Sequence, residues 1–268
     1  MALSQNEIHS LTNTAIKAAR AGGAVLNQYA QQTFHIQKKD YDVNLLTEAD
    51  LKSEEVVIKT LNHAYPSHQI LSEEKGLHPS SDQRFKWIID PLDGTTNFAH
   101  GFPMYNVSIG LEYEGTRLIG VVYDPTRNEL FVGQKDHGAT LNGSSIHVSA
   151  TAQLDKALLV TGFAYDVHTV PDNNLKEFCH FTLRARGLRR TGSAAIDLCY
   201  VACGRFDGFW ERSLHPWDTA AGTLIVEEAG GKVTHYKGEP FSIYGKEIVA
   251  SNGIIHQEMV SALHEIRS

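Results

Sequence analysis

One short stretch, residues 87–98, limits how this chain can fold and what it can bind. It opens with Trp87-Ile88-Ile89, whose apolar and β-branched side chains predict a short buried strand. Asp90 follows, and Pro91 is expected to end the strand because proline has no backbone N–H to donate. Asp93 comes three residues after Asp90, so this interpretation places two carboxylates on one short turn.

The residues after Asp93 suggest an anion site. Gly94 allows a ligand to approach the backbone closely, and Thr95-Thr96-Asn97 is expected to begin a helix. The first N–H groups of a helix have no partner within it, and the helix dipole also favours an anion there. Two carboxylates for a divalent cation would then lie beside donors for a phosphate. The alternative is a plain hairpin, because Asp-Gly favours tight turns between paired strands.

The stretch resembles the signature W-x-[IV]-D-P-[IL]-D-G-T-x-N-F of the inositol monophosphatase family. The family's second signature, W-D-x-A-A-G, is matched by residues 217–222, and its metal-binding Glu-Glu pair by Glu73 and Glu74. The three motifs occur in the family's order, and the resemblance covers nearly the whole chain. It implies a fold of mixed α+β and α/β character, the layered αβαβα sandwich of the inositol monophosphatase and fructose-1,6-bisphosphatase type.

Composition narrows the class of protein further. The 268 residues are 42% hydrophobic, which is enough to bury one large core or two smaller ones. A net charge of −7 argues against a nucleic-acid surface. No apolar run approaches the roughly 20 residues that cross a bilayer. The first seven residues do not resemble a signal peptide, and three cysteines without zinc-type spacing suggest reduced thiols. We therefore expect a cytoplasmic protein that binds neither membranes nor nucleic acid.

The N-terminal half reads as two helices followed by a sheet. Ser4 and Glu7 form a capping box for the first helix, and Thr47 can cap a second, with Leu51, Ile58 and Leu61 as its apolar stripe. A strand at residues 69–72 would deliver the Glu-Glu pair, and residues 75–84 are expected to be an exposed loop. From Tyr105 short alternating strands predict an antiparallel sheet covered by the two helices, with a hairpin turn at Asn142-Gly143 and a strand at residues 146–148.

Near residue 150 the pattern changes to strands alternating with helices, which predicts an α/β arrangement. We expect a division into residues 1–150, with the helices, the antiparallel sheet and most metal ligands, and residues 151–268. The second part would carry Asp218 and the residues that recognise the substrate.

The resemblance implies a metal site formed by the carboxylates of Glu73, Asp90, Asp93 and Asp218 and by the backbone carbonyl of Leu92. Two bare unit charges about 4 Å apart repel by about 4 kcal/mol at an effective dielectric near 20, so four carboxylates together require cations. Oxygen ligands without thiolates favour a hard cation, and we expect two or three Mg²⁺ ions. The resemblance also implies inhibition by lithium.

Roles in catalysis likewise follow from the resemblance. Glu73 and Thr95 would orient and deprotonate an attacking water, with Asp50 accepting a hydrogen bond from the Thr95 hydroxyl. The N–H groups of Gly94 and Thr95 would bind phosphate oxygens. The residues expected around the alcohol part of the substrate are Gly192, Ser193, Ala194, Glu211 and Asp218, and Asp93 is also expected to bind the substrate. Many members of the family have Thr where this chain has Ser193, which keeps the hydroxyl but lacks a methyl group.

The expected function is Mg²⁺-dependent hydrolysis of myo-inositol 1-phosphate, by a protein that the resemblance implies to be a homodimer. One alternative is a related phosphatase for histidinol phosphate or fructose 1,6-bisphosphate, whose second phosphate could be held by Arg184, Arg186, Arg189 and Arg190. Another is a non-catalytic, transcription-accessory role, since some bacterial relatives assist transcription complexes. The scattered histidines form no metal-binding motif, and none is assigned to catalysis.

Overall fold

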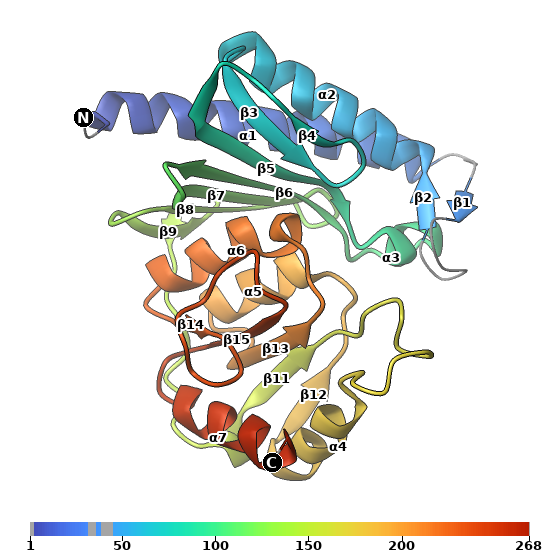
Figure 1. The fold of residues 1–268 in the computed structure, drawn as a ribbon, viewed down its shortest axis with the longest axis vertical. Helices are drawn as coiled ribbons and strands as arrows, with labels where there is room; N and C mark the ends of the chain where they lie inside the picture. Colours follow the sequence, from blue (N-terminus) through green and yellow to red (C-terminus); the bar gives the residue numbers. More distant parts are fainter. Residues whose placement is uncertain (1–2, 32–35, 39–44, 268) are drawn as a thin grey trace.

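Two capped helices, α1 (Gln5–Tyr29) and α2 (Glu48–Ala64), form the first layer of the molecule (Figure 1). The computed structural model describes residues 3–31, 36–38 and 45–267. α1 begins with the predicted capping box of Ser4 and Glu7. α2 begins at the predicted cap, Thr47, whose backbone N–H donates a hydrogen bond of 2.7 Å to the Asp50 carboxylate. Both predicted helix starts are confirmed.

The buried face of α2 is more polar than its sequence pattern suggests. Leu51, which was expected in the apolar stripe, is 39% exposed, so that part of the prediction is wrong. The residues of α2 that are buried are Ala49, Asp50, Ser53, Glu54, Val57 and Leu61. Polar side chains occupy this face because three of them bond to segments beneath the helix, as described below.

An eight-stranded sheet lies under α1 and α2, in the order β10-β9-β8-β7-β6-β5-β3-β4. Its strands are β3 (His68–Ser72), β4 (Gly76–His78), β5 (Asp82–Asp93), β6 (Asn106–Tyr113), β7 (Thr116–Asp124), β8 (Glu129–Gln134), β9 (Gly138–Leu141) and β10 (Ser144–Ser145). β3 and β5 are parallel, and the other neighbours are antiparallel. Trp87, Ile89 and Val107 share one core with α1 and α2. The predicted sheet under two helices is confirmed, with one parallel pair added. A separate ribbon, β1 (Ile36–Lys38) with β2 (Leu45–Thr47), precedes α2.

Two local predictions about turns had opposite outcomes. Residues 75–84 are not a loop, because β4 pairs with β3 there and β5 begins already at Asp82. These polar residues form an edge strand and a strand start, neither of which shows apolar alternation. The turn at Asn142-Gly143 is confirmed, with φ of 50° and 82° between β9 and β10. The strand after that turn is Ser144–Ser145 rather than residues 146–148.

Below the first sheet lie a second helical layer, a second sheet and a last pair of helices (Figure 1). The second sheet has the order β12-β11-β13-β15-β14 and consists of β11 (Leu158–Thr161), β12 (Gly187–Arg189), β13 (Gly208–Arg212), β14 (Lys232–Thr234) and β15 (Glu247–Ser251). The helices are α4 (Leu175–Arg184), α5 (Ala194–Ala202), α6 (Pro216–Glu228) and α7 (His256–Arg267), and a 3₁₀ turn lies at Leu154–Lys156. None of the described helices is long and apolar enough to cross a bilayer.

The apolar clusters show how these layers stack. α5 and α6 share one core with residues of both sheets, among them Val122 of the first and Phe209 of the second. On the far side of the second sheet, Trp210 packs with Phe181 of α4 and Leu263 of α7. The order of layers is therefore helices, sheet, helices, sheet, helices, which is the predicted αβαβα sandwich.

Glycines in the first sheet let α6 lie directly against it. A Cβ added to Gly110 would lie 2.7 Å from the Ala220 Cβ, and one on Gly120 would lie 2.4 Å from the Ala221 carbonyl oxygen. No side chain fits at such distances, so these glycines and the Ala-Ala pair of the second signature set the separation of helix and sheet. The first turn of α6, which contains Asp218, is thereby held near β5 and β6.

Candidate active site

The two aspartates of the first signature lie on either side of a β-bulge. Asp90 pairs with Ser108 of β6, whereas Asp93 pairs with Asn106, so three steps along β5 match two along β6. The strand therefore does not end at Asp90 as predicted but continues to Asp93, with Pro91 inside the bulge. Proline is tolerated at that place because the extra residue of a bulge is left out of the hydrogen-bond ladder.

The bulge decides which way the second aspartate faces. Side chains alternate along a strand, so residues three apart normally point to opposite faces of a sheet. Because the bulge adds one residue to β5, the alternation of side chains is shifted by one, and Asp93 lies on the same face as Asp90, toward α5 and α6. Asp90 Oδ1 accepts the Leu92 N–H at 3.0 Å, and the Pro91 carbonyl accepts the Ser53 hydroxyl of α2 at 2.7 Å. Both flanks of the bulge are thus held by side chains.

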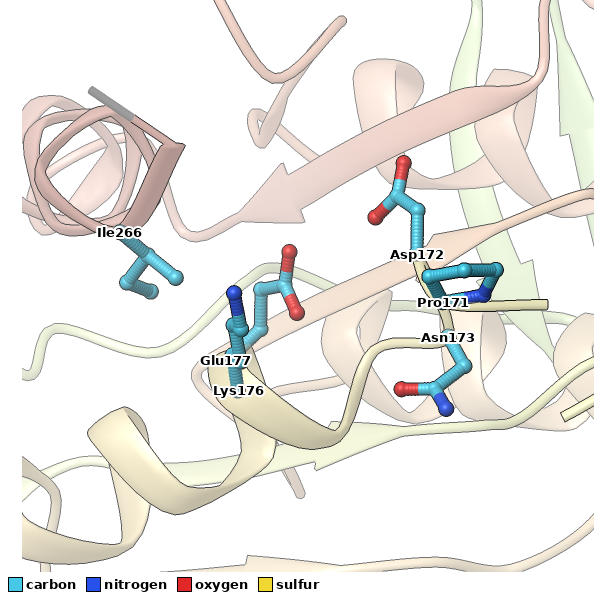
Figure 2. A pocket seen from close by; sticks show the side chains of 6 residues that line it. All are labelled: Pro171, Asp172, Asn173, Lys176, Glu177 and Ile266. Atoms are coloured by element: carbon cyan, nitrogen blue, oxygen red, sulfur yellow. The ribbon is translucent and has the colours of Figure 1, made fainter. Parts of the chain in front are cut away.

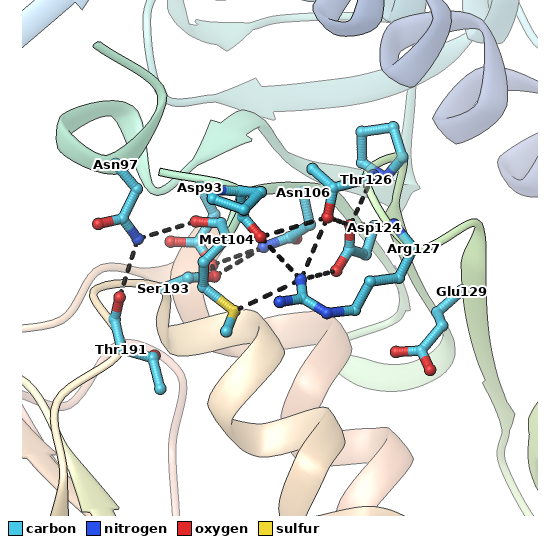
Figure 3. Close-up of polar contacts among 12 residues, drawn as sticks. Asp93, Asn97, Met104, Asn106, Asp124, Thr126, Arg127, Glu129, Thr191 and Ser193 are labelled. Carbon is cyan, nitrogen blue, oxygen red and sulfur yellow. Dashed lines mark hydrogen bonds and ion pairs between the residues drawn. The ribbon is translucent and has the colours of Figure 1, made fainter. Parts of the chain in front are cut away.

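Asp93 connects the first sheet to the start of α5. Its Oδ2 accepts hydrogen bonds from the Ser193 hydroxyl at 2.7 Å, from Asn106 Nδ2 at 2.9 Å and from the Ala195 N–H at 2.9 Å. Figure 3 shows Asn106 and Ser193 converging on this carboxylate. Two of the residues expected near the alcohol, Ser193 and Ala194, are thereby brought beside an expected metal ligand.

Thr95 lies between an oxygen of α2 and one of β5. Its Oγ1 is 3.1 Å from Asp50 Oδ1 and 3.1 Å from the Leu92 carbonyl oxygen. The other carboxylate oxygen of Asp50 accepts both the N–H and the hydroxyl of Thr47, at 2.7 and 2.5 Å. Asp50 is fully buried. The contact between Thr95 and Asp50 is the one that the family resemblance implies.

Gly94 needs to be glycine for two independent reasons. Its φ is 94°, in the left-handed region, and a Cβ there would lie 2.8 Å from the Met104 carbonyl oxygen. That carbonyl is fixed, because it accepts Asn97 Nδ2 at 2.8 Å (Figure 3). The backbone therefore turns from β5 into α3 (Thr95–Ala99), a helix of five residues, and not into a two-residue hairpin.

Glu73 is brought level with Asp90 by the parallel pairing of β3 and β5. Ser72 is the register partner of Ile89, and the Glu73 N–H donates to the Ile89 carbonyl at 3.1 Å. The turn that carries Glu73 is held from α2, where buried Glu54 accepts the Lys75 N–H at 3.1 Å and lies 3.2 Å from the Lys75 ammonium.

Asp218 enters the site from α6. Its Oδ2 accepts the His215 N–H at 2.6 Å and so closes the first turn of the helix. Burial raises its pKa well above the ordinary value, and the charges of Glu73, Asp93 and Glu211 raise it further. Asp218, although far away in the sequence, therefore belongs to the same acidic cluster.

The electrostatics of this cluster match a cation site. Burial raises the pKa of Asp90 well above its ordinary value, and so do three neighbouring carboxylates, those of Glu73, Asp93 and Asp218. Burial also raises the pKa of Asp93, against hydrogen bonds that favour its charged form. Across the described residues, no three His, Cys, Asp or Glu side chains are grouped closely enough to hold a metal ion by themselves. The donors are all carboxylate or carbonyl oxygens, which suit a hard divalent cation that would relieve their repulsion.

Glu211 lies on β13 and borders the same cluster. It is buried, and burial together with the charge of Asp93 raises its pKa to about 8, while Arg190 opposes the shift. The loop before α5 is tied to α3, because Asn97 Nδ2 donates to the Thr191 carbonyl at 2.8 Å (Figure 3). Gly192 lies in this loop with φ of 86°. Glu211, Gly192 and Ser193 thus surround the side of the cluster away from α2.

Several site residues were not predicted from the sequence. Asn106 contacts Asp93 only because of the β5–β6 register, and no local motif marks it. Asn97 is part of the first signature, which was a usable signal. The hydroxyl of Tyr165, from the loop before α4, lies near Thr96 and the acidic cluster, although the residue as a whole is 42% exposed. Desolvation of that hydroxyl and then the charges of Glu73, Asp218 and Asp93 raise its pKa. Each of these residues depends on contacts between distant segments.

Three of the four arginines proposed to hold a second phosphate have different partners in the structure. Arg184 donates to Glu265 of α7 and to His180, both at 2.9 Å, and Arg189 donates to the Leu188 carbonyl. Arg190 is the member of the set that acts on Glu211. A cavity of about 430 Å³ lies near α4 and α7, lined by Pro171, Asp172, Asn173, Lys176, Glu177 and Ile266 (Figure 2). It contains none of the predicted site residues.

Comparison with known proteins gives consistent matches over the whole chain. The model of the inositol monophosphatase family matches residues 7–268. An inositol-1-monophosphatase of Synechocystis is 48% identical over 97% of this chain and 91% of its own length. A putative Nus factor SuhB of Neisseria meningitidis is 40% identical over 94% and 97%. The solved structure of an inositol monophosphatase from Anabaena is 47% identical, covers 97% of both chains and has a TM-score of 0.89.

Proposed function

The chain belongs to the inositol monophosphatase family and is a phosphatase, and from that premise we propose that it hydrolyses myo-inositol 1-phosphate to inositol and phosphate with Mg²⁺. One observation carries the proposal: the carboxylates of Glu73, Asp93 and Asp218 all raise the pKa of Asp90. This acidic cluster lies beside Gly94, where the backbone turns into α3. Cation ligands and phosphate donors are thus on neighbouring residues.

The residues that would hold Mg²⁺ are Glu73, Asp90, Asp93, Asp218 and the carbonyl of Leu92. With the Thr95 hydroxyl hydrogen directed to Asp50, the lone pairs of the Leu92 carbonyl are left for a cation. When bound, two or three such ions would lower the pKa of the attacking water and supply positive charge that stabilises the alkoxide as it forms. Lithium is proposed to compete at this site. Inhibition of the phosphatase by lithium at saturating Mg²⁺ would support that assignment.

The protein's own groups position the reactants. Asp50 accepts the Thr95 hydroxyl hydrogen, which turns a lone pair of Thr95 Oγ1 toward the attacking water. The Glu73 carboxylate accepts a proton from that water as the water oxygen bonds to phosphorus. The bond from phosphorus to the alcohol oxygen breaks in line with the attack, and the departing oxygen takes up a proton from solvent water. The N–H groups of Gly94 and Thr95 hold phosphate oxygens. No protein group is phosphorylated.

The alcohol is proposed to lie between Asp93, Gly192, Ser193, Ala194, Glu211 and Asp218. Glu211 would accept hydrogen bonds from vicinal hydroxyls, which distinguishes a polyol from simpler alcohols. Ser193 donates to Asp93 and accepts from Asn106, so its hydroxyl is used within the protein. Histidinol phosphate and fructose 1,6-bisphosphate stay as alternative substrates, and Arg190, whose charge acts on Glu211, could hold the second phosphate of the bisphosphate.

Initial rates on a panel of phosphomonoesters test the proposal. The panel contains inositol 1-phosphate, histidinol phosphate, fructose 1,6-bisphosphate and p-nitrophenyl phosphate, each with Mg²⁺, with EDTA, and with Mg²⁺ restored. We expect the highest kcat/KM for inositol 1-phosphate, loss of activity with EDTA, and recovery with Mg²⁺. A preference for histidinol phosphate or the bisphosphate would overturn the substrate assignment, and full activity in EDTA would overturn the metal assignment.

Two further proposals concern assembly. We propose a homodimer on the family resemblance, and a monomer mass by light scattering at micromolar concentration would contradict it. The name of the N. meningitidis relative, a putative Nus factor, favours a transcription-accessory role as a second candidate function. Binding of the purified protein to RNA polymerase, retained in an inactive Asp90→Asn variant, would support that role and separate it from catalysis.

A further inference from the structure

The carboxylate of Glu211 lies against Gly162, the residue that follows the neighbouring strand β11. β11 and β13 are parallel, with Thr161 the partner of Trp210, so Gly162 comes next to Glu211 at the ends of the two strands. A Cβ added to Gly162 would lie 2.2 and 2.4 Å from the two carboxylate oxygens of Glu211. The side chain of Glu211 therefore occupies the space that any side chain at residue 162 would need.

Gly162 is required for room and not for backbone conformation. Its φ lies outside the left-handed region, in contrast to Gly94 and Gly192. An alanine would fit the backbone without strain. The three atoms nearest to such a Cβ all belong to the far end of the Glu211 side chain, so the substitution should move that side chain and leave the strands in place.

The backbone around Gly162 is fixed by Asn174, the residue before α4. Asn174 Nδ2 donates to the Gly162 carbonyl at 2.7 Å and to Thr161 Oγ1 at 2.8 Å, while its Oδ1 accepts Trp210 Nε1 at 2.7 Å. The residue is 1% exposed and has a φ of 69°, a conformation that asparagine tolerates better than most residues. One buried amide thus ties the ends of β11 and β13 together beside Glu211.

We propose that Gly162 is a specificity-determining position: because it has no side chain, it leaves the space in which the Glu211 carboxylate is aimed at the alcohol of the substrate. The importance of that aim rests on the proposed function, in which Glu211 recognises vicinal hydroxyls. Gly162 does not touch the substrate; it acts through Glu211. A side chain at this position weakens recognition of a polyol and spares hydrolysis itself.

The test is a double-mutant cycle of Gly162→Ala and Glu211→Ala, with kcat/KM measured at pH 9.5 on inositol 1-phosphate and p-nitrophenyl phosphate. Gly162→Ala should reduce kcat/KM for inositol 1-phosphate by about 10-fold or more, the effect of losing one hydrogen bond to a charged group. The value for p-nitrophenyl phosphate should change by less than about 3-fold, and in the Glu211→Ala background the added effect should vanish. Gly187→Ala on β12, where a Cβ meets atoms no closer than 3.5 Å, is the matched control.

A Gly162→Ala enzyme that keeps wild-type kcat/KM on inositol 1-phosphate would overturn the proposal. So would an equal loss on both substrates, or a loss that persists in the Glu211→Ala background. A crystal structure of Gly162→Ala gives a readout that does not need activity. If the strands are unchanged and the Glu211 carboxylate has moved, the structure supports the role of Gly162 in positioning Glu211. That support holds even if the wild-type protein hydrolyses no phosphomonoester, in which case the proposed function alone fails. If the Glu211 carboxylate has not moved, the proposed role of Gly162 in positioning it is contradicted.

Discussion

Asp50 and Thr95 are joined across two layers of the fold, with Asp50 Oδ1 3.1 Å from Thr95 Oγ1. The other oxygen of the same carboxylate accepts the Thr47 N–H and completes the cap of α2. One side chain therefore both starts a helix and orients a hydroxyl in the candidate active site. These two effects can be separated by mutation.

Asp50→Asn is expected to lower kcat about 10- to 100-fold, since hydrogen bonds to charged groups contribute about 1.5–3 kcal/mol. Thr47→Ala is the matched control: it removes the capping hydroxyl and its hydrogen bond to Asp50 Oδ2, but it leaves the bond from the Thr47 N–H to Asp50 and the contact between Asp50 and Thr95. It should lower the free energy of unfolding by about 0.5–2 kcal/mol with kcat nearly unchanged. Steady-state kinetics and urea unfolding of both variants check this. Equal effects of the two substitutions on kcat would show that Asp50 acts only through the helix.

Asp90→Asn is expected to lower activity more than about 100-fold, since even partners outside the ligand shell typically contribute about 10- to 100-fold. The fold should survive, because removing one of several buried, mutually repelling carboxylates relieves strain in the metal-free protein. Melting temperatures are measured with EDTA and with Mg²⁺. We expect an unchanged or higher value in EDTA and a smaller rise on adding Mg²⁺ than in the wild-type protein. Substantial activity in the variant would remove Asp90 from the metal site.

Glu211→Gln is expected to lower kcat/KM for inositol 1-phosphate by about 10- to 100-fold at alkaline pH, with a smaller effect on p-nitrophenyl phosphate. The pKa of Glu211 is raised to about 8, so the carboxyl group is largely protonated below that pH and ionised above it. Glutamine resembles the protonated form. The ratio of wild-type to variant kcat/KM should therefore rise as the pH is increased from 6.5 to 9.5. A ratio independent of pH would contradict this titration.

His256 should make the protein less stable in mild acid. It is buried, its two ring nitrogens lie 2.9 Å from Thr234 Oγ1 and Ser251 Oγ, and burial lowers its pKa from 6.5 to about 4. Between these values the unfolded chain binds a proton that the folded chain does not. The free energy of unfolding should therefore fall as the pH falls from 6.5 to 4, by about 3 kcal/mol from this residue at most.

Urea unfolding of wild-type protein and of His256→Gln, measured in EDTA across this pH range, checks the prediction. The variant lacks the titrating group, so its stability should depend less on pH than that of the wild type. His264→Gln, at an exposed histidine of the same helix, should behave like the wild type. Parallel curves for wild type and His256→Gln would contradict the prediction.

The sequence predicted best where the pattern was local. The capping box at Ser4, the start of α2 at Thr47 and the turn at Asn142-Gly143 each depend on a few adjacent residues, and all three are present in the structure. The layered fold was inferred from signatures spread along the chain. Residues 76–78 were missed because an edge strand made of polar residues has no apolar alternation to reveal it.

The site could be predicted only as a set of residues and not as an arrangement. Asp90 and Asp93 were assigned to a turn after a strand, because Pro91 normally ends strands, but the structure keeps the strand and inserts a bulge. Asn106 and the Ala195 N–H reach Asp93 through strand register and helix placement. Neither contact can be predicted from the residues next to Asn106 or Ala195 in the sequence. Long-range pairing, which single residues do not encode, supplied the missing part.

The bulge at Pro91 makes the number of residues at this place matter more than their identity. Deletion of one residue between Asp90 and Asp93 would make β5 regular and keep Asp93 on the face of Asp90, but it would remove one of the two carbonyls that Ser53 and Thr95 contact. Insertion of one residue would shift the alternation and point Asp93 toward α1 and α2. The Ser193 hydroxyl, Asn106 amide and Ala195 N–H would then lose their common acceptor. Substitutions at residues 91 and 92 keep the count and this orientation. The segment is therefore open to changes of side chain but closed to changes of length.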